Sequence, residues 1–276
     1  MATRSDRGDS RMTGLDEQNA AFWDELCGSM LARQIGITDA SAASLRRFDE
    51  AYFNFYPYLM RHLQPIVARR GRTLEIGLGY GTVSEFLALT AVDYHGLDIA
   101  RGPVEMVRGR LSEIGQSGRS EQVVEGSALE IPWPDGYFDN VVSIGCLHHT
   151  GDLARSIREV HRVLAPGGLA MVMVYNRNSL RHLVFVRPQA AIARLSGDTG
   201  NRAARAMYDA NADGDPAPCT EFSSARRMRR LFGQFSSVRI VRENMDEMTR
   251  LRVPREPLLG WPAHLLGLDL YVTAVK

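Results

Sequence analysis

Lysine is nearly absent from this 276-residue chain, whose single lysine is the terminal Lys276. A P-loop that binds phosphates requires a lysine after its glycines, and pyridoxal enzymes require an internal lysine for the Schiff base. Neither mechanism is open to this chain. The three cysteines, Cys27, Cys146 and Cys219, lie far apart without metal-ligand spacing. They predict a reducing compartment, no disulfide framework and no metal site.

Long apolar runs and a large net charge are also missing. No run approaches the roughly 20 residues of a membrane span. Residues 1–14 are polar and carry no apolar signal core, so we expect a disordered N-terminus, a cytoplasmic protein and no membrane partner. The net charge of +1 provides no global field toward nucleic acid. The length suffices for one full domain plus a cap.

The most informative segment is residues 75–81, which read Glu-Ile-Gly-Leu-Gly-Tyr-Gly between an apolar strand and a predicted helix at 82–88. Glycines at alternate positions let the backbone turn sharply and approach a ligand closely. The start of the following helix offers free N–H groups to a polar ligand. A tight turn without a ligand is the other interpretation, because a glycine-rich turn alone is a weak signal.

Further polar positions follow the predicted strands. Asp98 closes an apolar run at 91–97 and lies about 20 residues beyond the glycine-rich turn, where an acid meets the hydroxyls of a ribose. The alternative for Asp98 is a helix cap. A strand at 122–124 leads into Ser127 and Ala128, and a strand at 138–145 leads into two consecutive histidines. Alternating strands and helices over 71–175 predict a parallel sheet with helices on both faces.

In combination these elements resemble the class I S-adenosylmethionine-dependent methyltransferases, in particular the small-molecule branch called type 11. The resemblance is close over residues 72–176 and covers 223–276 in outline. It implies an α/β, Rossmann-like, doubly wound sheet of seven strands, mostly parallel with an antiparallel last strand. A helical cap at 15–70 would precede the methyltransferase domain at 71–276, and an insertion at 176–222 would follow the fifth strand and cover the substrate.

The resemblance implies S-adenosyl-L-methionine as cofactor and S-adenosyl-L-homocysteine as product. It implies methyl transfer to an O or N nucleophile of a small molecule, with secondary metabolism as one setting. The cofactor positions that it implies are Glu75, Gly77, Gly79, Asp98, Ile99, Ser127, Ala128, Gly145 and Tyr56. Ser127 departs from the family, which often has an aspartate there facing the adenine amino group. The oligomeric state is open, with a homodimer as one alternative.

Three residues are candidates for the substrate side. His149 follows the fourth strand and could act as a base, while Tyr175 and Asn176 end the fifth strand. A packing role is the alternative for His149, and we expect His148 to face the core. The aromatic residues at 53–58 could close over the sulfonium by cation–π contact or could be core. Arginines 177, 181 and 187 could bind an acidic substrate or form a solvated face.

Two other functions are compatible with parts of the pattern. An NAD-dependent oxidoreductase would use a similar sheet, but Thr82 stands where the third glycine of a dinucleotide motif would fall. A non-catalytic module that binds S-adenosylmethionine is the second alternative, and the long insertion argues against it.

Overall fold

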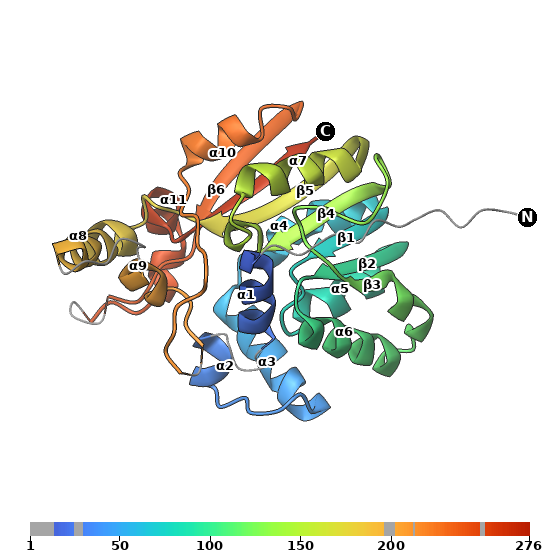
Figure 1. Ribbon diagram of the computed structural model, residues 1–276, viewed down its shortest axis with the longest axis horizontal. Helices are drawn as coiled ribbons and strands as arrows, with labels where there is room; N and C mark the ends of the chain where they lie inside the picture. The colour runs from blue at the N-terminus through green and yellow to red at the C-terminus, as the bar shows by residue number, and fades with distance from the viewer. Residues whose placement is uncertain (1–13, 25–29, 196–201, 212, 249–251) are drawn as a thin grey trace, which may run out of the picture.

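The computed structural model describes residues 14–24, 30–195, 202–211, 213–248 and 252–276. All but the last residue of the predicted disordered segment 1–14 therefore lies outside the described residues. A seven-stranded sheet of order β3-β2-β1-β4-β5-β7-β6 forms the centre of the molecule (Figure 1). Its strands are β1 Arg72–Ile76, β2 Asp93–Asp98, β3 Val123–Glu125, β4 Phe138–Ile144, β5 Leu164–Tyr175, β6 Ser237–Glu243 and β7 Asp269–Val275.

The pairing of the strands confirms the predicted fold class. β1 pairs in parallel with β2 and β4, β2 with β3, and β4 with β5, whereas β7 runs antiparallel to both of its neighbours, β5 and β6. The second strand begins at Asp93, two residues later than the apolar run suggested. Ala91 instead caps the preceding helix through its N–H group, and the side chain of Val92 is 63% exposed.

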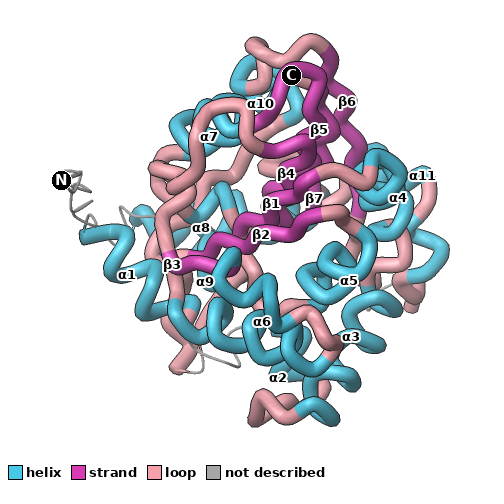
Figure 2. The backbone as a smooth tube through the Cα atoms, turned by 90° about the vertical axis from the view of Figure 1, so that its right-hand side faces the viewer, coloured by secondary structure: helices cyan, strands magenta, loops and turns pink. Residues whose placement is uncertain are grey.

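Helices cover both faces of the sheet (Figure 2). Successive strand residues alternate between the two layers, as a pleated strand requires. Val141 packs toward α7 and α10, and its neighbour Val142 packs toward α4, α5 and α6. These helices are α4 Leu59–Arg69, α5 Thr82–Thr90, α6 Arg101–Glu113, α7 Leu153–Val163 and α10 Ala225–Leu231.

The remaining helices come from the N-terminal segment, the insertion after β5 and the connection before β7. The N-terminal helices are α1 Gly14–Trp23, α2 Met30–Gln34 and α3 Ala42–Phe55. The insertion contains a π-helical turn at His182–Val186 and the helices α8 Arg187–Leu195 and α9 Arg202–Ala206, and α11 Trp261–Leu266 precedes β7. The division into cap, domain and lid at the stated boundaries stays a prediction.

A buried ion pair fixes helix α3 to helices α5 and α6. Arg110 is 4% exposed and donates from Nη1 to Asp49 Oδ2 at 2.8 Å and from Nη2 to Asp49 Oδ1 at 2.9 Å. Its Nη1 also lies 2.9 Å from Glu85 Oε2. Gly81, at φ +76°, leaves room for this side chain, because a Cβ there would lie 2.8 Å from Arg110 Cδ. The third glycine of the turn therefore serves the attachment of α3.

Asp49→Ala is expected to lower the free energy of unfolding by about 3 kcal/mol, because a buried guanidinium loses its two-pronged partner. Urea unfolding of the ligand-free protein measures this change. Glu50→Ala, on the exposed side of the same helix, is the matched control and should change the unfolding free energy by less than about 0.5 kcal/mol. Equal stability of the two variants would contradict a structural role for the pair.

Candidate active site

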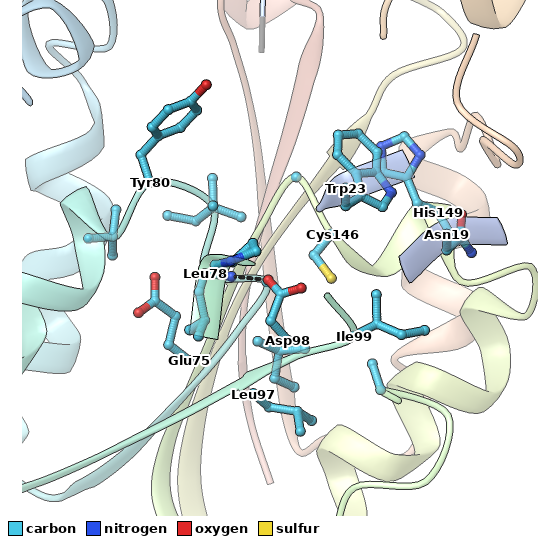
Figure 3. Close-up of a pocket in the computed structure, with 18 of the residues that line it drawn as sticks. Asn19, Trp23, Glu75, Leu78, Tyr80, Leu97, Asp98, Ile99, Cys146 and His149 are labelled. Carbon is cyan, nitrogen blue, oxygen red and sulfur yellow. Dashed lines mark hydrogen bonds between the residues drawn. The ribbon is translucent and has the colours of Figure 1, made fainter. Parts of the chain in front are cut away.

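A cavity of about 250 Å³ lies at the carboxyl ends of β1, β2 and β4 (Figure 3). β1 is flanked by β2 on one side and β4 on the other, so the chain reverses its winding direction here, and open α/β sheets bind ligands at such a point. The strand ends and the turns after them contribute Glu75, Gly77, Gly79, Asp98, Ile99, Ser127, Ala128, Gly145, Cys146 and His149 to the wall. Helices α1 and α3 contribute Asp16, Asn19, Trp23, Phe48 and Tyr52.

Two glycines of the turn after β1 have different tasks. At Gly77, where φ is +84°, a Cβ would lie 2.3 Å from the Cβ of Cys146, so this glycine allows the turns after β1 and β4 to pack closely. At Gly79, where φ is +52°, a Cβ would meet nothing within 4 Å. The backbone at Gly79 is therefore open to the cavity, and a ligand can approach it closely.

The carboxylate of Asp98 is held by backbone groups at the floor of the cavity. Its Oδ2 accepts a hydrogen bond from the N–H of Leu78 at 2.7 Å (Figure 3). Its Oδ1 accepts one from the N–H of Ala100 at 2.9 Å. Burial raises the pKa of Asp98, and these N–H groups oppose the shift. The backbone N–H groups of Gly79 and Ile99 also contact this carboxylate. Asp98 nevertheless lines the cavity, where its oxygens can meet a ligand hydroxyl.

Glu75 lies at the end of β1 and is 3% exposed. Its Oε2 accepts a hydrogen bond from the hydroxyl of Tyr94 at 2.6 Å. Burial raises the pKa of Glu75 from 4.5 to about 7, although the hydrogen bond from Tyr94 opposes the shift. The side chain therefore titrates near neutral pH and can be a hydrogen-bond donor or a carboxylate in the cavity wall.

Glu75→Gln is expected to weaken the pH dependence of stability. Because folding raises the pKa of Glu75, this side chain contributes its full share to the free energy of unfolding below pH 4.5. That share is lost as the pH rises through 7. Between pH 5 and 8 the wild-type protein should lose up to about 3 kcal/mol more unfolding free energy than the variant. Urea titrations at both pH values test this, with the exposed Glu113→Gln as control. Parallel pH profiles of Glu75→Gln and wild type would contradict the assignment.

His149 contacts the insertion from the turn after β4. Its Nδ1 lies 2.7 Å from the carbonyl oxygen of Cys219, and its Nε2 lies 3.6 Å from Oδ2 of Asp209. The neutral imidazole donates its Nδ1–H to that carbonyl, which leaves the lone pair on Nε2. Burial lowers the pKa of His149, and the charge of Asp209 opposes this shift. The hydroxyl of Tyr175 donates to Oδ1 of Asp209 at 3.1 Å.

His148 lies behind His149 and away from the cavity. It is fully buried, with its ring centroid 4.1 Å from that of His149 and 4.3 Å from that of Tyr175. Burial holds its pKa well below the usual value, so the ring is neutral. Of the two histidines, only His149 lines the cavity.

Three candidates from the sequence lie outside this cavity wall. Tyr56 packs against the ring of Tyr52, which lines the cavity in its place. Tyr175 reaches the site through Asp209 and through the rings of His148 and His149, whose centroids lie 4.3 and 6.0 Å from its own. Asn176 is fully buried, and its amide donates to the carbonyl of Gly267 at 2.8 Å and accepts from the N–H of Asn178 at 3.0 Å. The assignment of Asn176 to the substrate is therefore corrected, because its side chain closes the turn after β5.

The wall formed by the N-terminal helices was not predicted from the sequence. The rings of Phe48 and Tyr80 stack with centroids 4.2 Å apart, and the ring of Trp23 lies 4.8 Å from that of His149. Arg33 of α2 donates to the carbonyls of Ala210 and Asn211 at 2.6 Å, so this helix contacts the insertion beside the cavity. The signal for α1 was available, since Asp16, Asn19 and Trp23 are spaced i, i+3 and i+7 on one helix face.

Residues 74–172 match the family model described as a methyltransferase domain. The chain contains a methyltransferase domain of the class I fold. Within the described ranges, no three His, Cys, Asp or Glu side chains are grouped to hold a metal ion. None of the helices in those ranges has the length and apolar character needed to cross a membrane.

Curated relatives of this methyltransferase domain include an enzyme named ubiquinone biosynthesis O-methyltransferase from Pseudomonas aeruginosa. It is 34% identical over 116 residues, which are 42% of this chain and 49% of the relative. The chain thus spans about half the length of the first relatives it matches. A malonyl-acyl-carrier-protein O-methyltransferase from Halorhodospira halophila is 28% identical over 68% of this chain and 67% of its own.

Solved structures share the fold of this methyltransferase domain over most of the chain. An S-adenosylmethionine-dependent methyltransferase from Archaeoglobus fulgidus has a TM-score of 0.51 at 16% identity and covers 81% of this chain and 97% of its own. The cyclase SpnF has a TM-score of 0.56 at 17% identity, and the match covers 95% of this chain and 96% of SpnF. At these identities the likeness establishes the fold alone.

Proposed function

We propose that this chain is an S-adenosylmethionine-dependent methyltransferase that methylates an oxygen or nitrogen atom of a small molecule. One observation carries the proposal: a single cavity at the switch point of a methyltransferase domain joins an open glycine turn, the Asp98 carboxylate and a buried histidine. Two relatives named as O-methyltransferases support an oxygen acceptor. The antiparallel β7 between β5 and β6 argues against the oxidoreductase alternative, whose dinucleotide sheet runs 3-2-1-4-5-6.

The residues in the cavity fit S-adenosylmethionine. Asp98 presents its carboxylate in the cavity wall for the ribose hydroxyls, and the open backbone at Gly79 allows the close approach of a bulky sulfonium compound. Ile99 and Ala128 provide an apolar surface, and Ser127 adds a hydroxyl beside it. When bound, the cofactor supplies a methyl group on a positively charged sulfur, which is already a strong electrophile. The protein must therefore align the acceptor and exclude water.

His149 would take the proton of the acceptor at Nε2, an atom that is buried beside Asp209 here and that a shift of the insertion would have to uncover. The hydrogen bond from Nδ1 to the Cys219 carbonyl orients the ring and fixes the tautomer. Once protonated, the imidazolium would face the Asp209 carboxylate, whose Oδ2 lies 3.6 Å away and has no hydrogen-bond partner among the described residues. Tyr175 positions this carboxylate through its hydroxyl. We therefore assign His149 as the base and Asp209 as the residue that stabilises its charged form.

The insertion at 176–222 would serve as the lid of this site. It supplies both the Cys219 carbonyl and the Asp209 carboxylate to His149 from above the strand ends. Aromatic side chains of α1 and α3 complete the cover and exclude water from the cavity.

The test is methyl transfer from isotopically labelled S-adenosylmethionine to a panel of phenols, alcohols and amines. The expected result is label in at least one acceptor together with an equal amount of S-adenosylhomocysteine. Cofactor binding without transfer to any acceptor would favour the non-catalytic alternative. A variant lacking Asp98 should lose transfer through weaker binding, which ties the activity to this cavity.

A further inference from the structure

Helix α1 crosses the mouth of the cavity and is attached at both sides. Near its middle, Asn19 donates from Nδ2 to the carbonyl of His149 at 2.9 Å, next to the end of β4. Just beyond its end, Asp24 accepts the N–H of Gly102 at 2.5 Å, at the start of α6 after β2. Figure 3 shows Asn19 and Trp23 beside His149 at the rim of the cavity. The helix therefore faces the part of the cavity between these two strand ends.

The inward face of α1 carries two buried polar side chains beside Trp23, where a surface helix usually buries apolar residues. Asp16 and Asn19 are 5% and 3% exposed and line the cavity, whereas Glu17, Gln18 and Ala21 are exposed. The Oδ1 atom of Asn19 has no hydrogen-bond partner among the described residues. A buried amide oxygen without a partner is destabilising. A ligand N–H group in the cavity would remove this destabilisation.

We propose that Asn19 and Asp16 recognise the exocyclic amine of the adenine base, an inference that rests on the proposed function. Both side chains offer oxygen acceptors from one helix face, so they select a donor on the ligand. With the ribose at Asp98, the polar side of the cavity at Glu75 suits the amino-acid end of the cofactor. The apolar side at Ile99 and Ala128 suits a flat base, and on this side Asp24, just beyond α1, contacts the start of α6.

The proposal assigns a specificity role to the N-terminal segment. Ser127 Oγ already accepts the N–H of Leu129 at 3.2 Å, so its hydroxyl hydrogen remains to donate to a ring nitrogen of the base. The acceptors for the amine then come from α1. A purine that carries an oxygen in place of the amine would face Asn19 Oδ1 with another acceptor, and both oxygens would be left without a partner.

Calorimetric titration of the full chain tests the proposal with two probes, S-adenosylhomocysteine and S-inosylhomocysteine, which carries oxygen in place of the amine. Wild-type protein should prefer the adenine compound by at least about tenfold, the value of one hydrogen bond. Asn19→Leu should abolish most of this preference, and Asp16→Asn should reduce it. The exposed Gln18→Leu is the control on the same helix and should keep the wild-type preference.

If Asn19→Leu only damaged the site locally, binding of both probes would weaken equally and the preference for the adenine compound would remain. That result would overturn the proposal. A third probe, 5′-methylthioadenosine, lacks the amino-acid end but keeps the base. Asn19→Leu should weaken its binding by the same factor as that of S-adenosylhomocysteine. Unchanged binding of 5′-methylthioadenosine would place the contact at the amino-acid end and also overturn the proposal. Absence of S-adenosylhomocysteine binding by wild-type protein would instead contradict the proposed function itself.

Discussion

His149→Ala is expected to lower the rate of methyl transfer by about 10²-fold or more, with the affinity for S-adenosylhomocysteine largely kept. The variant removes the Nε2 lone pair that would take the acceptor proton, but leaves the strand-end residues of the cavity in place. Single-turnover measurements with an alcohol as acceptor make the loss visible, because an alcohol keeps its proton at neutral pH.

The pH profile provides a second readout of the same variant. The neutral imidazole is the active form of the base, so the wild-type rate should fall as the pH drops through the pKa of His149. Burial lowers this pKa, so the acid limb should lie below 6.5. The variant should lack the limb. His161→Ala, on α7 outside the cavity wall, is the control. A His149→Ala enzyme that keeps most of its turnover would show that the ring only packs, and that alignment supplies the catalysis.

Asp98→Ala is expected to weaken S-adenosylhomocysteine binding by about 1–3 kcal/mol, which corresponds to roughly 5- to 150-fold. The variant removes the two oxygens proposed for the ribose hydroxyls. It also removes the acceptor of the Leu78 N–H, which holds the glycine-rich turn against β2. Calorimetry on the folded variant measures the change.

Asp93→Ala is the matched control for this variant, because Asp93 begins the same strand at the opposite edge of the sheet and lies outside the cavity wall. It should bind S-adenosylhomocysteine like the wild type. Unchanged affinity in a folded Asp98→Ala protein would mean that Asp98 acts only on the backbone of Leu78 and Ala100, and the ribose assignment would be withdrawn.

The sequence predicted the strand-end half of the cavity because that half is encoded locally. A glycine turn must follow its strand directly, and parallel strands bring their carboxyl ends to one edge, so residues 75–79, Asp98, Ser127 and Gly145 were bound to meet. The fold class followed from the same alternation of strands and helices. These features depend on short-range geometry and on the rule that ligands bind at a switch point.

The helical half of the cavity depends on tertiary packing, which local patterns leave undetermined. The aromatic segment before α4 was recognised, but the rotation of α3 directs Tyr52 to the cavity and Tyr56 away from it. Asp209 lies 60 residues beyond His149 in the chain and reaches it only because the insertion folds back. Asn176 looked like a strand-end candidate, and the turn after β5 uses its amide instead.

Titration of the wild-type chain with S-adenosylhomocysteine and, separately, with NAD decides which cofactor this cavity binds. We expect one S-adenosylhomocysteine per chain and no heat of binding from NAD. The adenine, ribose and amino-acid ends of the first compound should match the apolar side at Ile99, the Asp98 carboxylate and the polar side at Glu75. Binding of NAD without binding of S-adenosylhomocysteine would contradict the methyltransferase assignment.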